Sequence, residues 1–152
     1  MFSITRMRPF GSGMQMLDRD HRAISEILVE LNGLVAREAC PALQLRLLKE
    51  LGQLSAVHFA LEEGMMSATR YPSLPAHQLR HRRMAEEIRR VTASWSAKTA
   101  PALVQPAGLL WESHILHVEN EDLDFGRWVN GFRSPKPMRA CKVAQLEEAV
   151  AV

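Results

Sequence analysis

The chain has 152 residues and a net charge of +2, from 19 Lys and Arg against 17 Asp and Glu. This length fits one domain, and 47% hydrophobic residues with 24% charged residues is typical of a globular protein. So small a positive surplus does not support a nucleic-acid-binding protein, and no apolar run approaches the roughly 18 residues of a membrane span. Two cysteines are too few for a disulfide scaffold, and the N-terminus lacks the pattern of a secretory signal. We therefore expect a cytoplasmic protein.

Apolar residues and histidines recur at alternating steps of three and four in four segments, and this spacing predicts a helix in each. The first helix is expected to start at Asp18 as its N-cap, to run through Asn32-Gly33 and to fray near residue 38. The other three are expected at about 41–70, 76–97 and 107–132, separated by segments that contain prolines.

Four amphipathic helices with short connections predict an all-α protein, an up-down-up-down four-helix bundle. Three regions are expected along the chain. Residues 1–16 form an N-terminal arm, residues 17–132 form the bundle, and residues 133–152 form a basic linker and a tail. Within the tail, Ala140 to Val152 is expected to form one short helix.

All six histidines lie on the apolar stripes, and each expected helix carries at least one. A buried polar side chain must find a partner, so six histidines in a core indicate a shared role. His58 and Glu62 lie four residues apart, as do His77 and His81, and each pair therefore projects from one face of its helix. Together with imidazoles on the first and fourth helices, these pairs indicate a metal site. Imidazole with carboxylate suits iron, manganese or zinc better than magnesium or calcium.

These segments resemble the hemerythrin and bacteriohemerythrin family. Residues 58–66 read HFALEEGMM and are similar to its HFxxEExxM signature. DRDH at residues 18–21 resembles its DxxH, and Tyr71-Pro72 with HQLRH at residues 77–81 resembles its third-helix motif. HVENED at residues 117–122 matches its His-x4-Asp. The resemblance covers about residues 17–130.

The resemblance implies a bundle that holds two non-heme irons joined by an oxo or hydroxo bridge. It assigns five imidazole ligands and two bridging carboxylates, which are His21, His58, His77, His81, His117, Glu62 and Asp122. This set leaves one coordination position open on one iron, and in the family that position receives O2. Apolar side chains around the site keep water and reductants away, which favours reversible binding.

The expected function is therefore that of an O2 carrier, store or local supplier, with O2 as the partner. One alternative is a sensor of O2 or redox state that acts on a protein partner through the arm or the tail. Another is a di-iron enzyme that handles peroxide or nitric oxide. An imidazole-rich ligand set argues against the carboxylate-rich di-iron oxidases, so an enzyme is the less favoured reading. A zinc site or a purely structural site is the simplest alternative.

The last helix allows two assignments of the ligands. His114 with Glu119 keeps the family's His-Ile sequence but replaces its Asp with Glu, whereas His117 with Asp122 keeps the Asp. Helical spacing alone would instead pair His117 with Glu121. We favour His117 and Asp122 because of the resemblance, and His114 is then expected beside the ligands or near the helix surface.

Overall fold

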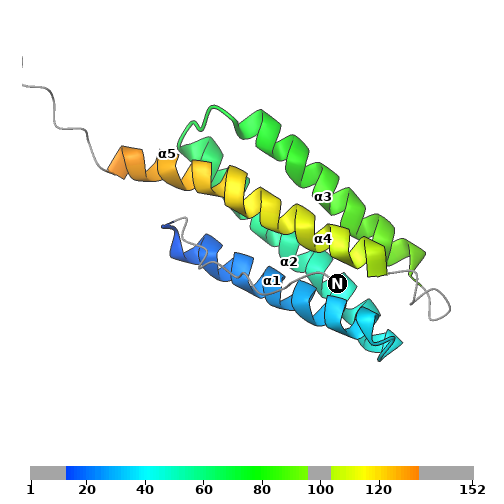
Figure 1. The fold of residues 1–152 in the computed structure, drawn as a ribbon. Coiled ribbons are helices and arrows are strands. Elements are labelled where there is room, and N and C mark those ends of the chain that lie inside the picture. Colours follow the sequence, from blue (N-terminus) through cyan, green and yellow to red (C-terminus); the bar gives the residue numbers. More distant parts are fainter. Residues whose placement is uncertain (1–12, 96–103, 134–152) are drawn as a thin grey trace, which may run out of the picture.

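The computed structural model describes residues 13–95 and 104–133 of the chain. Neighbouring rods of the four-helix bundle run antiparallel, and each rod packs against two others (Figure 1). The first three rods are α1 (Gln15–Ala36), α2 (Pro41–Ala68) and α3 (Leu74–Ser94). The fourth consists of α4 (Val104–His117), a π-helical segment η2 (Val118–Asp122) and α5 (Leu123–Arg133) in direct succession. The prediction of an all-α, up-down-up-down bundle is confirmed.

Three of the four helix starts differ from expectation, and α3 begins at Leu74 rather than near residue 76. α1 begins at Gln15, with Met14 in the N-cap position and no side-chain cap, so the prediction of Asp18 as the N-cap is wrong. Asp18 lies in the first turn of α1, where its charge is favourable to the helix dipole. α4 begins at Val104, because Pro106 is tolerated in a first helical turn. The helix expected at 140–152 lies outside the described residues, as do residues 1–12 of the expected arm.

The Asn32-Gly33 pair stays helical, as predicted. The Asn32 side-chain amide donates hydrogen bonds to the carbonyl oxygens of Leu28 (2.8 Å) and Ala107 (3.1 Å). The second of these bonds joins α1 to α4. A residue typical of turns therefore ties two helices together here.

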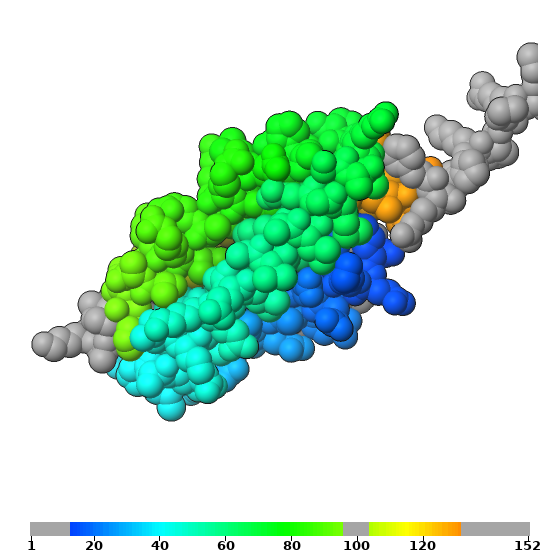
Figure 2. Space-filling view, turned by 180° about the vertical axis from the view of Figure 1, so that it is seen from behind, coloured from blue at the N-terminus to red at the C-terminus, as the bar shows by residue number. Residues whose placement is uncertain are grey.

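Two apolar clusters fill the bundle, one on each side of a belt of buried polar side chains. Along α1, Leu17 belongs to one cluster and Ile24 to the other, with His21 between them. The larger cluster includes Leu28, Leu31, Leu48, Leu51, Ile88 and Leu110, and the smaller includes Met14, Leu17, Met66, Phe125 and Val129. Side chains of α1, α2 and α3 close one face of the bundle over this interior (Figure 2). Within the described ranges, no helix combines the length and apolarity needed to cross a membrane.

The turn between α2 and α3 places Arg70 in the left-handed region, at φ 52°. The N–H of Arg70 donates to the carbonyl of Ser67 (3.1 Å), and the N–H of Tyr71 donates to that of Met66 (2.9 Å). These two bonds form a Schellman motif, in which glycine is the usual residue at the left-handed position. The Cβ of Arg70 makes this backbone conformation energetically unfavourable. Arg70 is exposed, so burial of its side chain does not compensate for this cost.

Replacing Arg70 with Gly should raise the free energy of unfolding of the metal-free protein by about 1 kcal/mol, because glycine adopts positive φ without steric cost. Chemical denaturation would measure the difference. Arg70→Ala is the matched control, since it removes the same charge and keeps the Cβ. A glycine variant no more stable than the alanine variant would contradict this account of the turn.

Candidate metal centre

The seven residues assigned as ligands from sequence meet in the belt between the two apolar clusters. α1 supplies one of them, α2 two, α3 two, and the fourth rod two, at the ends of α4 and η2. All seven are buried, with 3% or less of each residue exposed: His21, His58, Glu62, His77, His81, His117 and Asp122. Their ligand atoms form two groups, within each of which all atoms lie within 4.8 Å of one another. Asp122 belongs to both groups.

The larger group has three imidazoles and two carboxylates. Nε2 of His77 lies 3.3 Å from Oε2 of Glu62, and Nε2 of His81 lies 3.4 Å from the same oxygen. Nε2 of His117 lies 3.0 Å from Oδ1 of Asp122 and 2.9 Å from Nε2 of His81. The three inner nitrogens therefore face one small volume together with two carboxylate oxygens, which is an arrangement suited to a cation.

The smaller group has two imidazoles and shares the carboxylate of Asp122 with the larger group. Nε2 of His21 lies 3.0 Å from Oδ2 of Asp122, and Nε2 of His58 lies 3.7 Å from Oε2 of Glu62. The rings of His21 and His58 are 4.5 Å apart. Asp122 thus turns one oxygen to each group, an arrangement that lets a carboxylate bridge two cations.

The protonation states of the site also fit a cation. Burial raises the pKa of Glu62, but hydrogen bonds from His77 and His81 outweigh it and lower this pKa to about 2. Burial also opposes ionisation of Asp122, yet hydrogen bonds from His117 and His21 hold its pKa well below the usual range. Burial and the neighbouring His21 lower the pKa of His58 to about 4. At neutral pH the carboxylates are ionised and His58 is neutral, the forms that bind metals.

One oxygen of Glu62 supports the same conclusion. Oε1 is buried and has no hydrogen-bond partner among the described residues. A buried carboxylate oxygen without a partner costs free energy, and native structures rarely retain one unless an ion or a water satisfies it. The donor set and this oxygen therefore fit a bound metal.

The π-helical segment η2 explains the five-residue step between His117 and Asp122. In an α-helix, residues four positions apart lie on the same face. Regular α-helical geometry would therefore place Glu121 on the same face as His117. In η2 each turn is wider, and the N–H of Leu123 reaches the carbonyl of Val118, five residues back. The extra residue turns Asp122 into the belt. Glu121 moves outward, where its Oε2 lies 3.4 Å from Nδ1 of His117.

A ring of outer carboxylates lies behind the imidazoles, and the sequence analysis did not assign them. Oε1 of Glu63 lies 2.8 Å from Nδ1 of His81, and Gln78 donates to the other oxygen of Glu63 (3.0 Å). The outer carboxylates are Asp20, Glu63 and Glu121. Only Glu63 is hydrogen-bonded to its imidazole, whereas Asp20 lies 3.7 Å from Nδ1 of His58 and Glu121 lies 3.4 Å from Nδ1 of His117. A carboxylate bonded to the outer nitrogen orients the ring so that Nε2 faces inward. Each of these carboxylates stands next to a predicted ligand in the sequence (His21, Glu62 or Asp122), and this adjacency could have identified them.

His114 and Glu119, the alternative ligands on the last helix, are not part of either group. Glu119 is exposed. His114 is buried, with 4% exposed, and its Nε2 lies 3.0 Å from Oγ of Ser25. Its ring centroid lies 6.2 Å from that of His21. The structure brings together His117 and Asp122, and it places His114 beside them.

Alanine variants test this arrangement of the last helix. His117→Ala and Asp122→Ala should lose bound metal, because each removes a ligand atom from the belt. His114→Ala should keep its metal, and Glu119→Ala should behave as the wild type. Elemental analysis of the four purified variants would show the difference. Loss of metal in His114→Ala or Glu119→Ala, with His117→Ala intact, would show that the other pair binds.

Comparison with known proteins agrees with the geometry. The family model of the hemerythrin HHE cation-binding domain matches residues 12–129. No curated protein and no solved structure matches the chain. The matched segment contains all seven residues of the belt, and it spans α1 to α3 and most of the fourth rod. The chain therefore belongs to the hemerythrin family of HHE cation-binding domains.

Proposed function

We propose that this protein holds two non-heme irons in the belt and binds O2 reversibly at one of them. The observation that carries the proposal is the pair of ligand groups that share Asp122. Two adjacent groups with a common carboxylate suit a bridged metal pair, whereas a structural zinc site needs only four ligands around one ion. Imidazole with carboxylate also suits iron.

The two groups differ in the number of donors that they offer. His77, His81 and His117 would hold one iron together with Glu62 and Asp122. The other iron would have two imidazoles, from His21 and His58, and the same two carboxylates. With fewer protein donors, this second position leaves room for an external ligand. When bound, a reduced iron pair supplies the electrons that O2 binding requires.

The surroundings of the site favour binding over turnover of a substrate. Leu17, Met66 and Phe125 close the belt on one side, each fully buried. The ring of Phe59 stacks on His81 with centroids 4.0 Å apart. An apolar shell of this kind limits the access of water and of large reductants to a metal site. Reversible binding of a small neutral gas is consistent with such limited access.

The proposal predicts a reversible optical change. Protein loaded with iron should contain two irons per chain, change its absorption spectrum when reduced anaerobically and exposed to air, and recover its spectrum when O2 is removed. Absorption spectroscopy with iron analysis would follow these steps. One zinc and no iron after expression in iron-rich medium would contradict the di-iron assignment. Permanent oxidation at the first exposure to air would contradict reversible binding.

The bridging role of Glu62 gives a second test. Glu62→Ala should lose both irons together, because Oε2 of Glu62 faces His58 of the smaller group as well as His77 of the larger one. The variant should remain helical but unfold more easily than the iron-loaded protein, since metal bound to the folded state adds to stability. Glu50→Ala, an exposed change on the same helix, is the matched control. Full iron content in Glu62→Ala, measured by elemental analysis, would show that Glu62 is not a bridge.

A further inference from the structure

Positive charge is concentrated on one helix of the bundle. α3 has five arginines and two glutamates, a formal net charge of +3. Acidic residues outnumber basic ones in each of the other rods, with four against two in α1, three against two in α2 and five against two in the fourth rod. So uneven a distribution creates a local field that attracts a partner of negative charge. The small net charge of the whole chain gives no sign of it.

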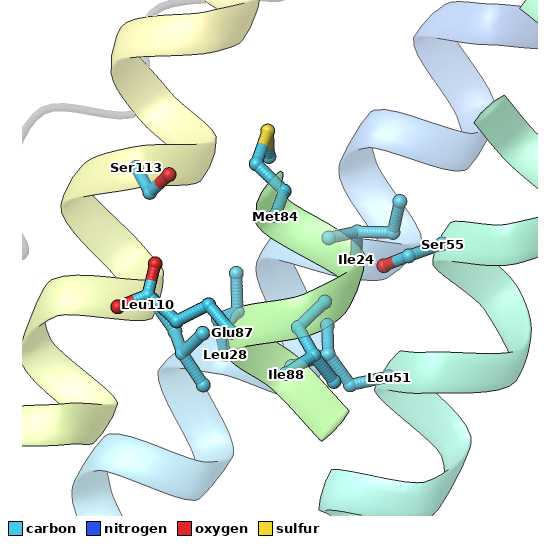
Figure 3. A pocket seen from close by; sticks show the side chains of 9 residues that line it. All are labelled: Ile24, Leu28, Leu51, Ser55, Met84, Glu87, Ile88, Leu110 and Ser113. Carbon is cyan, nitrogen blue, oxygen red and sulfur yellow. The ribbon is translucent and has the colours of Figure 1, made fainter. Parts of the chain in front are cut away.

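The outer side of α3 carries this charge. On its inner side, Met84 and Ile88 line a small cavity together with Leu28 and Leu51 of α1 and α2 (Figure 3). The outer side is exposed, and α3 runs along one edge of the molecule (Figure 2). Charged side chains of both signs line a surface hollow there, and they are Arg82, Arg83, Glu86, Glu87 and Arg90. We define the arginine face as these five residues together with Leu79, which is 43% exposed.

Two arginines of this face have no acidic partner among the described residues. Each glutamate of the face lies near an arginine three positions later, with N–O distances of 2.6 Å and 3.7 Å. Arg82 and Arg83 are exposed and form no ion pair within the described ranges. Their guanidinium groups are therefore available to carboxylates of another molecule, which they can bind through two parallel hydrogen bonds.

The mixture of charges fits an acidic protein better than a nucleic acid or a second copy of the chain. Glu86 and Glu87 lie among the arginines and would repel a closely spaced row of phosphates. A symmetric pair of copies that met at this face would bring two positive helices together. A protein partner can place carboxylates against Arg82 and Arg83 and an apolar side chain against Leu79.

The arginine face lies beside a hydrogen-bonded chain that leads to the belt. Gln78 and Arg82 are four residues apart and so share one side of α3. Gln78 donates to Oε2 of Glu63 (3.0 Å), and Oε1 of Glu63 lies 2.8 Å from Nδ1 of His81. The side chain of Glu63 is 26% exposed, so this chain starts at the surface and ends at a proposed ligand. A partner on the arginine face would therefore approach the metal site without entering the apolar interior.

We propose that the arginine face docks an acidic electron-carrier protein that reduces the metal pair in the belt. The inference rests on the proposed function, because reversible O2 binding requires the reduced pair and the apolar shell keeps dissolved reductants away. The partner belongs to the one-electron carriers, such as iron–sulfur or flavin proteins. Two reduced carriers each give one electron and are oxidised, two ferric ions become ferrous, and no atom is transferred. Electron-transfer contacts are typically small and guided by charge.

The rate of reduction by a plant-type ferredoxin, an acidic one-electron carrier, tests this inference. Reduced ferredoxin would be mixed with the air-oxidised, iron-loaded protein at low ionic strength, and absorption would follow the reaction. The double variant Arg82→Glu, Arg83→Glu should be reduced about tenfold or more slowly, because the steering charge is reversed. Added salt should slow the wild type more than this variant.

The matched control is the double variant Arg19→Glu, Arg22→Glu. It makes the same change in charge at two exposed residues of α1, which also flank a proposed ligand, His21. Its rate of reduction by ferredoxin should stay close to that of the wild type.

Binding supplies a second readout in which no electron passes. Calorimetry of oxidised ferredoxin with the oxidised, iron-loaded protein should show an affinity that Arg82→Glu, Arg83→Glu weakens about tenfold or more and the α1 variant leaves unchanged. Equal affinity and equal reduction rates in the wild type and Arg82→Glu, Arg83→Glu would overturn the inference and leave the O2 proposal intact. Tighter binding of duplex DNA, or of vesicles that contain phosphatidylserine, would also overturn it. A wild-type protein that holds no iron would overturn the proposed function, and electron delivery with it.

Discussion

Two buried carboxylates determine how the four rods meet. Glu62 and Asp122 are ionised inside the bundle, and a buried charge is tolerated only when charged or hydrogen-bonding partners surround it. Those partners are imidazoles from α1, α2, α3 and the end of α4. The relative position of the four rods along the bundle axis is therefore fixed by polar contacts at its centre. The apolar clusters above and below supply most of the burial, but apolar surfaces alone specify such positions less sharply.

The sequence predicted the helices because their apolar stripes follow the α-helical period closely. The i,i+4 pairs of α2 and α3 were visible for the same reason, and the structure places all four residues in the belt. The step from His117 to Asp122 does not follow that period, since η2 inserts one extra residue into a turn. Periodicity alone would have chosen Glu121, and only the resemblance to a family indicated Asp122. π-Helical turns of this kind often mark functional sites.

Other features depended on tertiary contacts that no local pattern carries. The N-cap expected at Asp18 failed because α1 begins at Gln15 with an apolar residue before it. Buried His114 contacts Ser25, which lies 89 residues away in the chain. Among the outer carboxylates, Glu63 of α2 reaches His81 of α3, whereas Glu121 reaches His117 within the fourth rod. Sequence reasoning therefore reached the ligands on each helix and missed contacts that join two helices, such as those of Ser25 with His114 and of Glu63 with His81.

The central claim is that Asp122 and Glu62 each serve two metals. A crystal structure of the iron-loaded protein, with diffraction data recorded at the iron absorption edge, tests it most directly. The account predicts two anomalous peaks per chain, one beside His77, His81 and His117 and one beside His21 and His58. Both peaks should lie within bonding distance of oxygens of the two carboxylates. A single peak, or coordination by Glu121 or Glu119 in place of Asp122, would contradict it.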